Sequence, residues 1–176
     1  MTTATGGISL SAGYQSTLGA GGSVAPFEDG LGSLVCMEQG AICVKGTTVA
    51  QNSMGTAWGV GIRIDVNQAQ ALNSVAMPYA VSAGSTGLFY AFTTLPPLAE
   101  IVVVLGDGTS YTDDYCFFPD VVSGTIPWSS FHQLCSSNPP GPALGGPPQT
   151  VSSVDVQVGV TQTAGSFDFC VSQLHF

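Results

Sequence analysis

The chain has 176 residues, only 7% of them charged, and eleven acidic residues against two basic ones give a net charge of −9. A length of this size suits one domain with a sizeable core, since domains commonly have about 100–200 residues. Two basic residues, Lys45 and Arg63, cannot form the positive surface that a nucleic-acid partner or an anionic membrane needs. No apolar run reaches the length of about 18 residues expected of a membrane-spanning helix.

Residues 1–25 are dominated by Gly, Ser, Thr and Ala, a composition typical of a flexible arm or a linker. Within them, Ile8–Tyr14 would suit a short strand. No basic and apolar leader follows Met1, so we expect no signal peptide in this sequence. We therefore predict an arm over residues 1–25 and a globular domain over residues 26–176.

Strand patterns dominate the globular part. Trp58–Val66 alternates most cleanly, with its apolar residues predicted to face the core and Arg63 and Asp65 to face outward. Val154–Val160 alternates in the same way, with Asp155 and Gln157 outward. The other predicted strands are Gly32–Met37, Ala41–Lys45, Gly87–Thr93, Glu100–Leu105, Tyr115–Phe118 and Ser166–Phe176.

The last of these segments, Ser166–Phe176 (SFDFCVSQLHF), has apolar residues on both predicted faces. Phe167, Phe169 and Val171 fall on one face, and Cys170, Leu174 and Phe176 on the other. This pattern predicts a central strand of a sandwich. Asp168 would then need a metal ion, a donor or water as its partner.

Helical patterns are short and few, at Asn67–Leu72 and Trp128–Leu134. Turn residues separate the predicted strands, most clearly in the Pro- and Gly-rich loop Asn138–Pro148. Eight to ten short strands with little helix predict an all-β fold, a β-sandwich of jelly-roll type.

The five cysteines, Cys36, Cys43, Cys116, Cys135 and Cys170, form no CxxC motif, and the two histidines lie far apart in the sequence. We therefore do not expect a zinc site. We expect disulfides, formed in an oxidising compartment. Cys36 and Cys43 flank a short turn, so we favour that pair. The other three cysteines would supply a second bridge and one free thiol.

Four segments, taken in order, resemble motifs of the galactose-binding-like jelly-roll domains found among carbohydrate-binding modules of secreted bacterial enzymes. They are Phe27–Gly30 (FEDG), Ala57–Gly61 (AWGVG), Pro78–Val81 leading into Thr86–Tyr90, and Val154–Val160 followed by Phe167–Cys170. The resemblance covers residues 26–176. It implies a secreted bacterial protein that binds sugars, although this fold serves many functions.

Many domains of this family hold a structural calcium ion between the start of the domain and its final strand. The matching residues here are Glu28, Asp29 and Asp168, and Ca²⁺ takes about six to eight oxygen ligands. The alternative is a solvated acidic pair, with Asp168 bonded to a nearby backbone N–H. For Asp113 and Asp114 we predict a solvated loop.

Sugar binding in this family uses a sheet face or the edge loops, with aromatic rings and polar groups as contacts. The candidates are the outward row Arg63, Asp65, Asp155 and Gln157 and the aromatic residues Tyr90, Tyr111, Tyr115 and Trp128. For Arg63 the alternative is an ion pair with Asp65 or Asp155. For Trp128 the alternative is packing at the edge of the core, and we predict Trp58 to be a core residue.

No catalytic motif is present in the sequence: it has no GxSxG, no HExxH and no phosphate- or dinucleotide-binding glycine loop. A dyad of His132 and Cys135 would require a free thiol, which a disulfide would remove. We expect a non-catalytic, secreted domain that binds a polysaccharide or glycan. The alternative is a structural or adhesive subunit that self-associates, adding its N-terminal arm as a strand to a neighbour's sheet.

Overall fold

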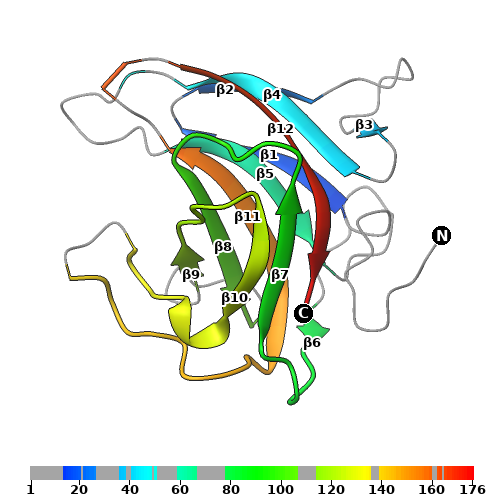
Figure 1. Ribbon diagram of the computed structural model, residues 1–176, viewed down its shortest axis with the longest axis vertical. Helices are drawn as coiled ribbons and strands as arrows, with labels where there is room; N and C mark the ends of the chain where they lie inside the picture. The colour runs from blue at the N-terminus through cyan, green and yellow to red at the C-terminus, as the bar shows by residue number, and fades with distance from the viewer. Residues whose placement is uncertain are drawn as a thin grey trace.

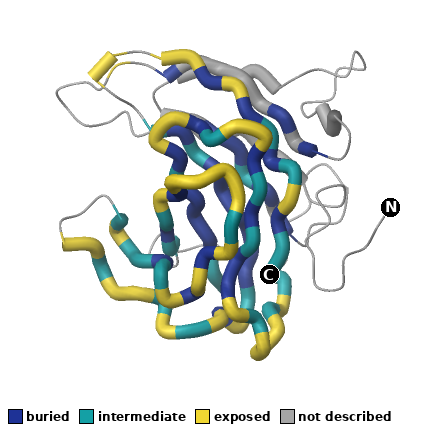
Figure 2. The backbone as a smooth tube through the Cα atoms, in the orientation of Figure 1, coloured by how far each residue is buried: buried dark blue, intermediate teal, exposed yellow. Residues whose placement is uncertain are grey.

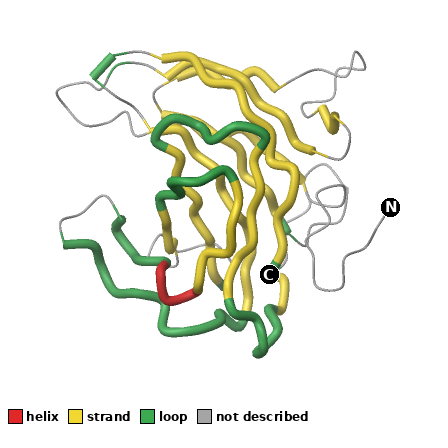
Figure 3. Tube along the Cα trace, in the orientation of Figure 1, coloured by secondary structure: helices red, strands yellow, loops and turns green. Residues whose placement is uncertain are grey.

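The computed structural model describes residues 14–20, 22–26, 36–38, 41–48, 50, 59–66, 78–106, 114–135, 139–159, 162–163 and 165–176. For residues 14–20, 22–26, 36–38, 42, 44–47, 59–60 and 65 it describes the backbone. Strands make up most of these residues, and the single helical element among them is the 3-10 turn Trp128–Ser130 (Figure 3). The described strands are β1 (Tyr14–Ala20), β2 (Gly22–Pro26), β3 (Cys36–Glu38), β4 (Ala41–Thr48), β5 (Gly59–Asp65), β6 (Tyr79–Ala80), β7 (Gly87–Phe92), β8 (Ala99–Leu105), β9 (Asp114–Phe117), β10 (Ser123–Pro127), β11 (Thr150–Gly159) and β12 (Gly165–His175).

These strands form two sheets that pack face to face (Figure 1). Sheet A has the order β10-β7-β12-β4-β2, with β3 beside β4, and sheet B has the order β1-β5-β11-β8-β9, with β6 beside β11. All ladders between the described strands are antiparallel.

The order of eight of these strands identifies the sandwich as a jelly roll. Along the chain these are β4, β5, β7, β8, β9, β10, β11 and β12. The first pairs with the last, β5 with β11, β7 with β10 and β8 with β9, so the chain is a folded-back double ribbon wound across both sheets. The predicted all-β jelly-roll sandwich is therefore confirmed.

The core lies between the inner faces of the two sheets, where dark blue segments of the strands face each other in Figure 2. Sheet B contributes Ile62 and Ile64 from β5 and four valines from β11, all at most 2% exposed. Sheet A contributes Leu88 and Tyr90 from β7 together with the phenylalanines of β12. The alternation predicted for Trp58–Val66 is confirmed where side chains are described, because Ile62, Ile64 and Val66 are buried. Trp58 lies outside the described residues.

Each strand predicted within residues 26–176 has a counterpart among the described strands, usually with ends shifted by a few residues. Four strands were not predicted: β1, β2, the two-residue β6 and β10. β1 pairs with β5 and β2 pairs with β4, so Tyr14–Ala20 and Gly22–Pro26 extend the two sheets. This part of the predicted arm therefore differs from a free linker. In the segment Ile8–Tyr14, which would suit a short strand, residues 8–13 lie outside the described residues.

The predicted faces of the last strand are wrong at two residues. Leu174 lies in the core with Phe167, Phe169 and Val171, and the half-buried Phe176 packs against the same core, so neither lies on the opposite face. The ladder between β12 and β7 shifts between Val171 and Gln173, so Ser172 is an extra residue in a β-bulge. The bulge changes the phase of the alternation, and the Ser172 hydroxyl donates to the Ala91 carbonyl at 3.1 Å.

Strand β11 contains a second bulge of the same kind. Its ladder with β8 shifts between Val151 and Ser153, and the extra residue is Ser152. The Ser152 hydroxyl donates to the Val104 carbonyl at 3.1 Å, and Ser152 is buried. In both sheets, a serine at the bulge thus satisfies a carbonyl of the neighbouring strand.

The helical segments predicted from the sequence are smaller or not covered. Trp128–Leu134 contains only the 3-10 turn Trp128–Ser130, and Asn67–Leu72 lies outside the described residues. In the part of the chain that the structure describes, no helix has the length and apolarity to cross a membrane.

Candidate functional site

The outer face of sheet B carries the polar row predicted to bind sugar. Strand register aligns Arg63 of β5 with Asp155 of β11, Val102 of β8 and Cys116 of β9. Arg63 donates from Nε and one terminal nitrogen to the two carboxylate oxygens of Asp155, at 2.9 and 2.8 Å. The alternative interpretation of Arg63, an ion pair with Asp155, is therefore confirmed.

Asp155 is buried, although its position in the alternation points it away from the core. Its side chain is 3% exposed and that of Arg63 is 38% exposed. The Ser153 hydroxyl donates to the same carboxylate at 3.3 Å. Burial raises the pKa of Asp155 above its ordinary value, while the bonds from Arg63 and Ser153 act in the opposite direction. A carboxylate that is 3% exposed and already bonded to Arg63 and Ser153 is not accessible to a sugar, which corrects the prediction for Asp155.

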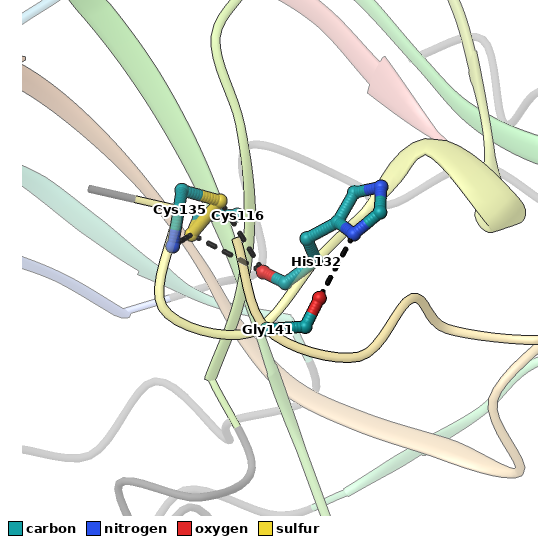
Figure 4. Close-up of a disulfide and its surroundings, with 4 residues drawn as sticks. All are labelled: Cys116, His132, Cys135 and Gly141. Atoms are coloured by element: carbon teal, nitrogen blue, oxygen red, sulfur yellow. Dashed lines mark hydrogen bonds between the residues drawn. A yellow bond between two sulfur atoms is a disulfide. The ribbon is translucent and has the colours of Figure 1, made fainter. Parts of the chain in front are cut away.

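A disulfide lies on the same outer face of sheet B, at strand β9. Cys116 of β9 is bonded to Cys135, and the backbone carbonyl of His132 lies 3.3 and 3.2 Å from the two sulfur atoms (Figure 4). The imidazole of His132 turns away from the disulfide, and its Nδ1 lies 3.1 Å from the Gly141 carbonyl (Figure 4). Because Cys135 carries no thiol, the His132–Cys135 dyad cannot act as a nucleophile.

Glu100 lies beside this disulfide. Within the described residues, Glu100, Cys116 and Cys135 are the one group of three potential metal ligands whose ligand atoms lie within 4.8 Å of one another. Both sulfur atoms are already bonded to each other, so the group offers a cation only one carboxylate. Burial raises the pKa of Glu100.

Two of the four aromatic residues predicted to stack on sugar, Tyr90 and Trp128, lie in the core, which corrects the prediction for these two. Tyr90 and Trp128 are each 2% exposed. The Tyr90 hydroxyl donates to the Val121 carbonyl, and Trp128 Nε1 donates to the Ser85 hydroxyl. Tyr115 is half-buried and packs against the core cluster. The edge-packing alternative for Trp128 is the one that the structure supports.

The structure does not describe the side chains of several predicted site residues. Tyr111, Asp113, Glu28 and Asp29 lie outside the described residues, and Asp65 is described by its backbone alone. Gln157 is half-buried and shares a register row with Glu100 on the outer face of sheet B. The structure therefore brings together only Arg63 and Asp155 of the predicted polar row in a described side-chain contact.

Asp168, the third predicted calcium ligand, is exposed on the outer face of sheet A. Its register partner is Lys45 of β4. An exposed carboxylate is solvated by water, so it does not need the buried partner that the sequence suggested. One described carboxylate is too few for Ca²⁺, so the calcium site stays a prediction.

The disulfides differ from the favoured pairing of Cys36 with Cys43. Cys43 of β4 is bonded to Cys170 of β12, with their Cα atoms 3.9 Å apart, and Cys116 is bonded to Cys135. Both pairs link cysteines brought close by tertiary structure, and the first joins residues 127 positions apart. Two disulfides are typical of a protein that folds in an oxidising compartment.

The outer face of sheet A contains a ring pair that the sequence did not reveal. Phe89 of β7 and His175 of β12 are register partners, and their rings stack with centroids 4.5 Å apart and planes 22° apart. Both residues are half-buried. We call this pair the ring ridge.

Uncharged polar residues border the ring ridge. Thr125 of the edge strand β10 is the register partner of Phe89. In the adjacent row, Ser123 and Gln173 flank Ala91. Thr125, Ser123 and Gln173 are all exposed. The face thus combines an apolar ridge with hydroxyl and amide groups that can donate and accept hydrogen bonds.

Comparison of the chain with models of known protein families gives no match, and comparison with curated proteins gives none either.

Proposed function

We propose that the protein is a secreted, non-catalytic carbohydrate-binding domain that holds a neutral glycan on the outer face of sheet A. The observation that carries the proposal is the ring ridge, Phe89 and His175, with Thr125, Ser123 and Gln173 beside it. In a stacked pair, each ring keeps one face free of the other ring. Such a face can pack against the C–H face of a sugar.

The polar neighbours suit the hydroxyl groups of the same sugar. Hydroxyl and amide groups can each donate and accept, which matches the mixed character of a sugar hydroxyl. A few placed polar groups around an apolar surface are the usual composition of a small-molecule site. The five residues of this surface carry no acidic group, and the chain carries a net charge of −9. These charges favour a neutral glycan over a polyanionic one.

Affinity electrophoresis through gels containing soluble xylan, mixed-linkage β-glucan or galactomannan tests this proposal. We expect at least one of these neutral polysaccharides to retard the intact chain, and Phe89→Ala to remove most of the retardation. Phe118→Ala is the matched control, because Phe118 is 50% exposed and follows β9 in the other sheet. Absence of retardation in every gel, or equal loss in both variants, would contradict the proposal.

Self-association by strand addition is the second candidate function, and one observation favours it. β10 (Ser123–Pro127) ends the order of sheet A and contains no charged residue. Charged side chains on an edge strand normally discourage pairing with another chain. Sedimentation of the intact chain over a range of concentrations tests this candidate. A sedimentation coefficient that rises with protein concentration, and a rise that Thr125→Lys abolishes, would support this candidate. A chain that stays monomeric at all concentrations would contradict it.

A further inference from the structure

Three of the five cysteines lie in one row across sheet A. β4 pairs with β12 over residues that include Ile42 and Cys43, and β3 pairs with the same two residues. An antiparallel strand has two edges, so β12 and β3 must lie on opposite sides of β4 at this point. Cys43 is the register partner of Cys170 on one side and of Cys36 on the other.

The bonds in the structure leave Cys36 without a cysteine to pair with. The chain has five cysteines, and the two disulfides, Cys43–Cys170 and Cys116–Cys135, use four of them. Register partners in an antiparallel pair stand on the same face of the sheet. Cys36 therefore belongs to the same face as the first disulfide, on the far side of Cys43 from Cys170.

We propose that Cys36 is the nucleophile of an internal thiol–disulfide exchange with the Cys43–Cys170 bond. Cys36 loses its proton to solvent, and the thiolate attacks Sγ of Cys43. A bond forms between Cys36 and Cys43, the bond between Cys43 and Cys170 breaks, and Cys170 leaves as a thiolate that takes a proton from solvent. The step conserves electrons and needs no external oxidant or reductant.

The row supplies the order that the reaction requires. Exchange proceeds by attack of a thiolate on one disulfide sulfur while the other sulfur departs. Across the sheet, the nucleophile, the attacked residue and the leaving group follow one another on β3, β4 and β12. The other disulfide provides an internal contrast, because the register partner of Cys116 in β8 is Val102 and its bridge partner is His132.

The exchange would move a covalent tie without changing the composition of the chain. In one form, the tie joins β4 to the last strand across 127 positions of sequence. In the other form, it closes the short β3–β4 hairpin between positions 36 and 43, and β12 is held only by its ladders and core contacts. The proposal is independent of sugar binding.

Mapping of the free thiol in the intact oxidised chain tests the proposal. The chain is held at mildly alkaline pH without added thiol, quenched in acid, unfolded, labelled with a maleimide, digested with pepsin and analysed by mass spectrometry. Pepsin suits this chain because Lys45 and Arg63 are its only tryptic sites and because acid stops exchange. We expect the label to divide between Cys36 and Cys170, with a faster approach to this division at higher pH.

Two variants separate this exchange from other chemistry. Cys36→Ser keeps both disulfides and should lose the label on Cys170 completely. Cys170→Ser should form the Cys36–Cys43 bond on oxidation. A label confined to Cys36 at all times, a free Cys36 in the Cys170→Ser variant, or a label that spreads to Cys116 and Cys135 would each overturn the proposal.

Discussion

The outer faces of the two sheets arise from the same alternating pattern but differ in how open they are to solvent. On sheet B, the outward acid Asp155 is buried and held by Arg63 and Ser153, and the Cys116–Cys135 disulfide lies in the same row of residues. On sheet A, the outward row around Phe89 and His175 keeps exposed polar neighbours. Alternation therefore identifies which residues face away from the core, but it does not show which outer face is accessible to a ligand.

The two disulfides give the largest expected difference between the faces. Closing a loop of 127 positions should stabilise the fold by about 5 kcal/mol, and closing one of 19 positions by about 3 kcal/mol, if the entropy of the unfolded chain dominates. We expect Cys43→Ala to lower the free energy of unfolding more than Cys116→Ala. Both residues are buried, so the packing losses are comparable. Urea unfolding measures the difference, and equal losses would contradict this entropic account.

The ion pair on sheet B gives the next largest effect. Arg63→Ala leaves the Asp155 carboxylate buried without its guanidinium, and we expect a loss of about 2 kcal/mol in the free energy of unfolding. This is less than the loss of about 3–5 kcal/mol typical of a fully buried pair, because the Arg63 side chain is 38% exposed. The double variant Arg63→Ala/Asp155→Ala should recover part of the loss. A double variant less stable than Arg63→Ala would show that the buried charge is not the cause.

The serine at each bulge gives a smaller effect that again differs between the sheets. Ser152→Ala removes the donor to the Val104 carbonyl at a buried site, so we expect a loss of about 1 kcal/mol. Ser172→Ala should cost less, because Ser172 is half-buried and water can reach the Ala91 carbonyl in its place. Thermal unfolding of the two variants provides the comparison. A larger loss for Ser172→Ala would contradict this assignment of burial.

Glu100 gives the smallest effect and the one that depends on pH. Burial raises the pKa of Glu100 in the folded chain above its ordinary value of 4.5. Between pH 4.5 and the pKa of the folded chain, the folded chain therefore binds more protons than the unfolded chain. The contribution of Glu100 to stability is therefore full below about pH 4.5 and falls as pH rises through the folded pKa. We expect Glu100→Gln to stabilise the chain at neutral pH by less than about 1 kcal/mol. Urea unfolding at pH 4 and pH 7 tests this, and a variant that is less stable at pH 7 would contradict it.

The sequence allowed the fold to be predicted where alternation was strict. Ile62, Ile64 and Val66 follow a period of two, and they lie in the core as expected. The predicted face of Leu174 was wrong because a bulge at Ser172 shifts the phase of the alternation. A single serine in a sequence does not indicate a bulge. β10 was missed because Ser123–Pro127 contains Gly, Pro and a single large apolar residue, a composition that is weak in strand signal.

The candidate site was harder to predict than the fold, for a physical reason. Apolar or aromatic residues occupy five consecutive positions in Gly87–Phe92, so alternation gave no reason to place Tyr90 inside and Phe89 outside. The disulfides depend on which strands become neighbours, and short sequence spacing therefore favoured the wrong pair. The ring ridge depends on the register of β7 with β12, which the bulge itself changes.

The most direct test of the central claim is to map which outer face meets the sugar. The ¹⁵N-labelled chain is titrated with cellohexaose, xylohexaose and laminarihexaose while its backbone amide signals are followed by NMR. We predict shifts concentrated at Phe89, Thr125, Gln173 and His175 for at least one of these neutral oligosaccharides. Shifts concentrated at Arg63, Gln157 and Glu100 on sheet B, or no shifts with any of the three, would contradict the account.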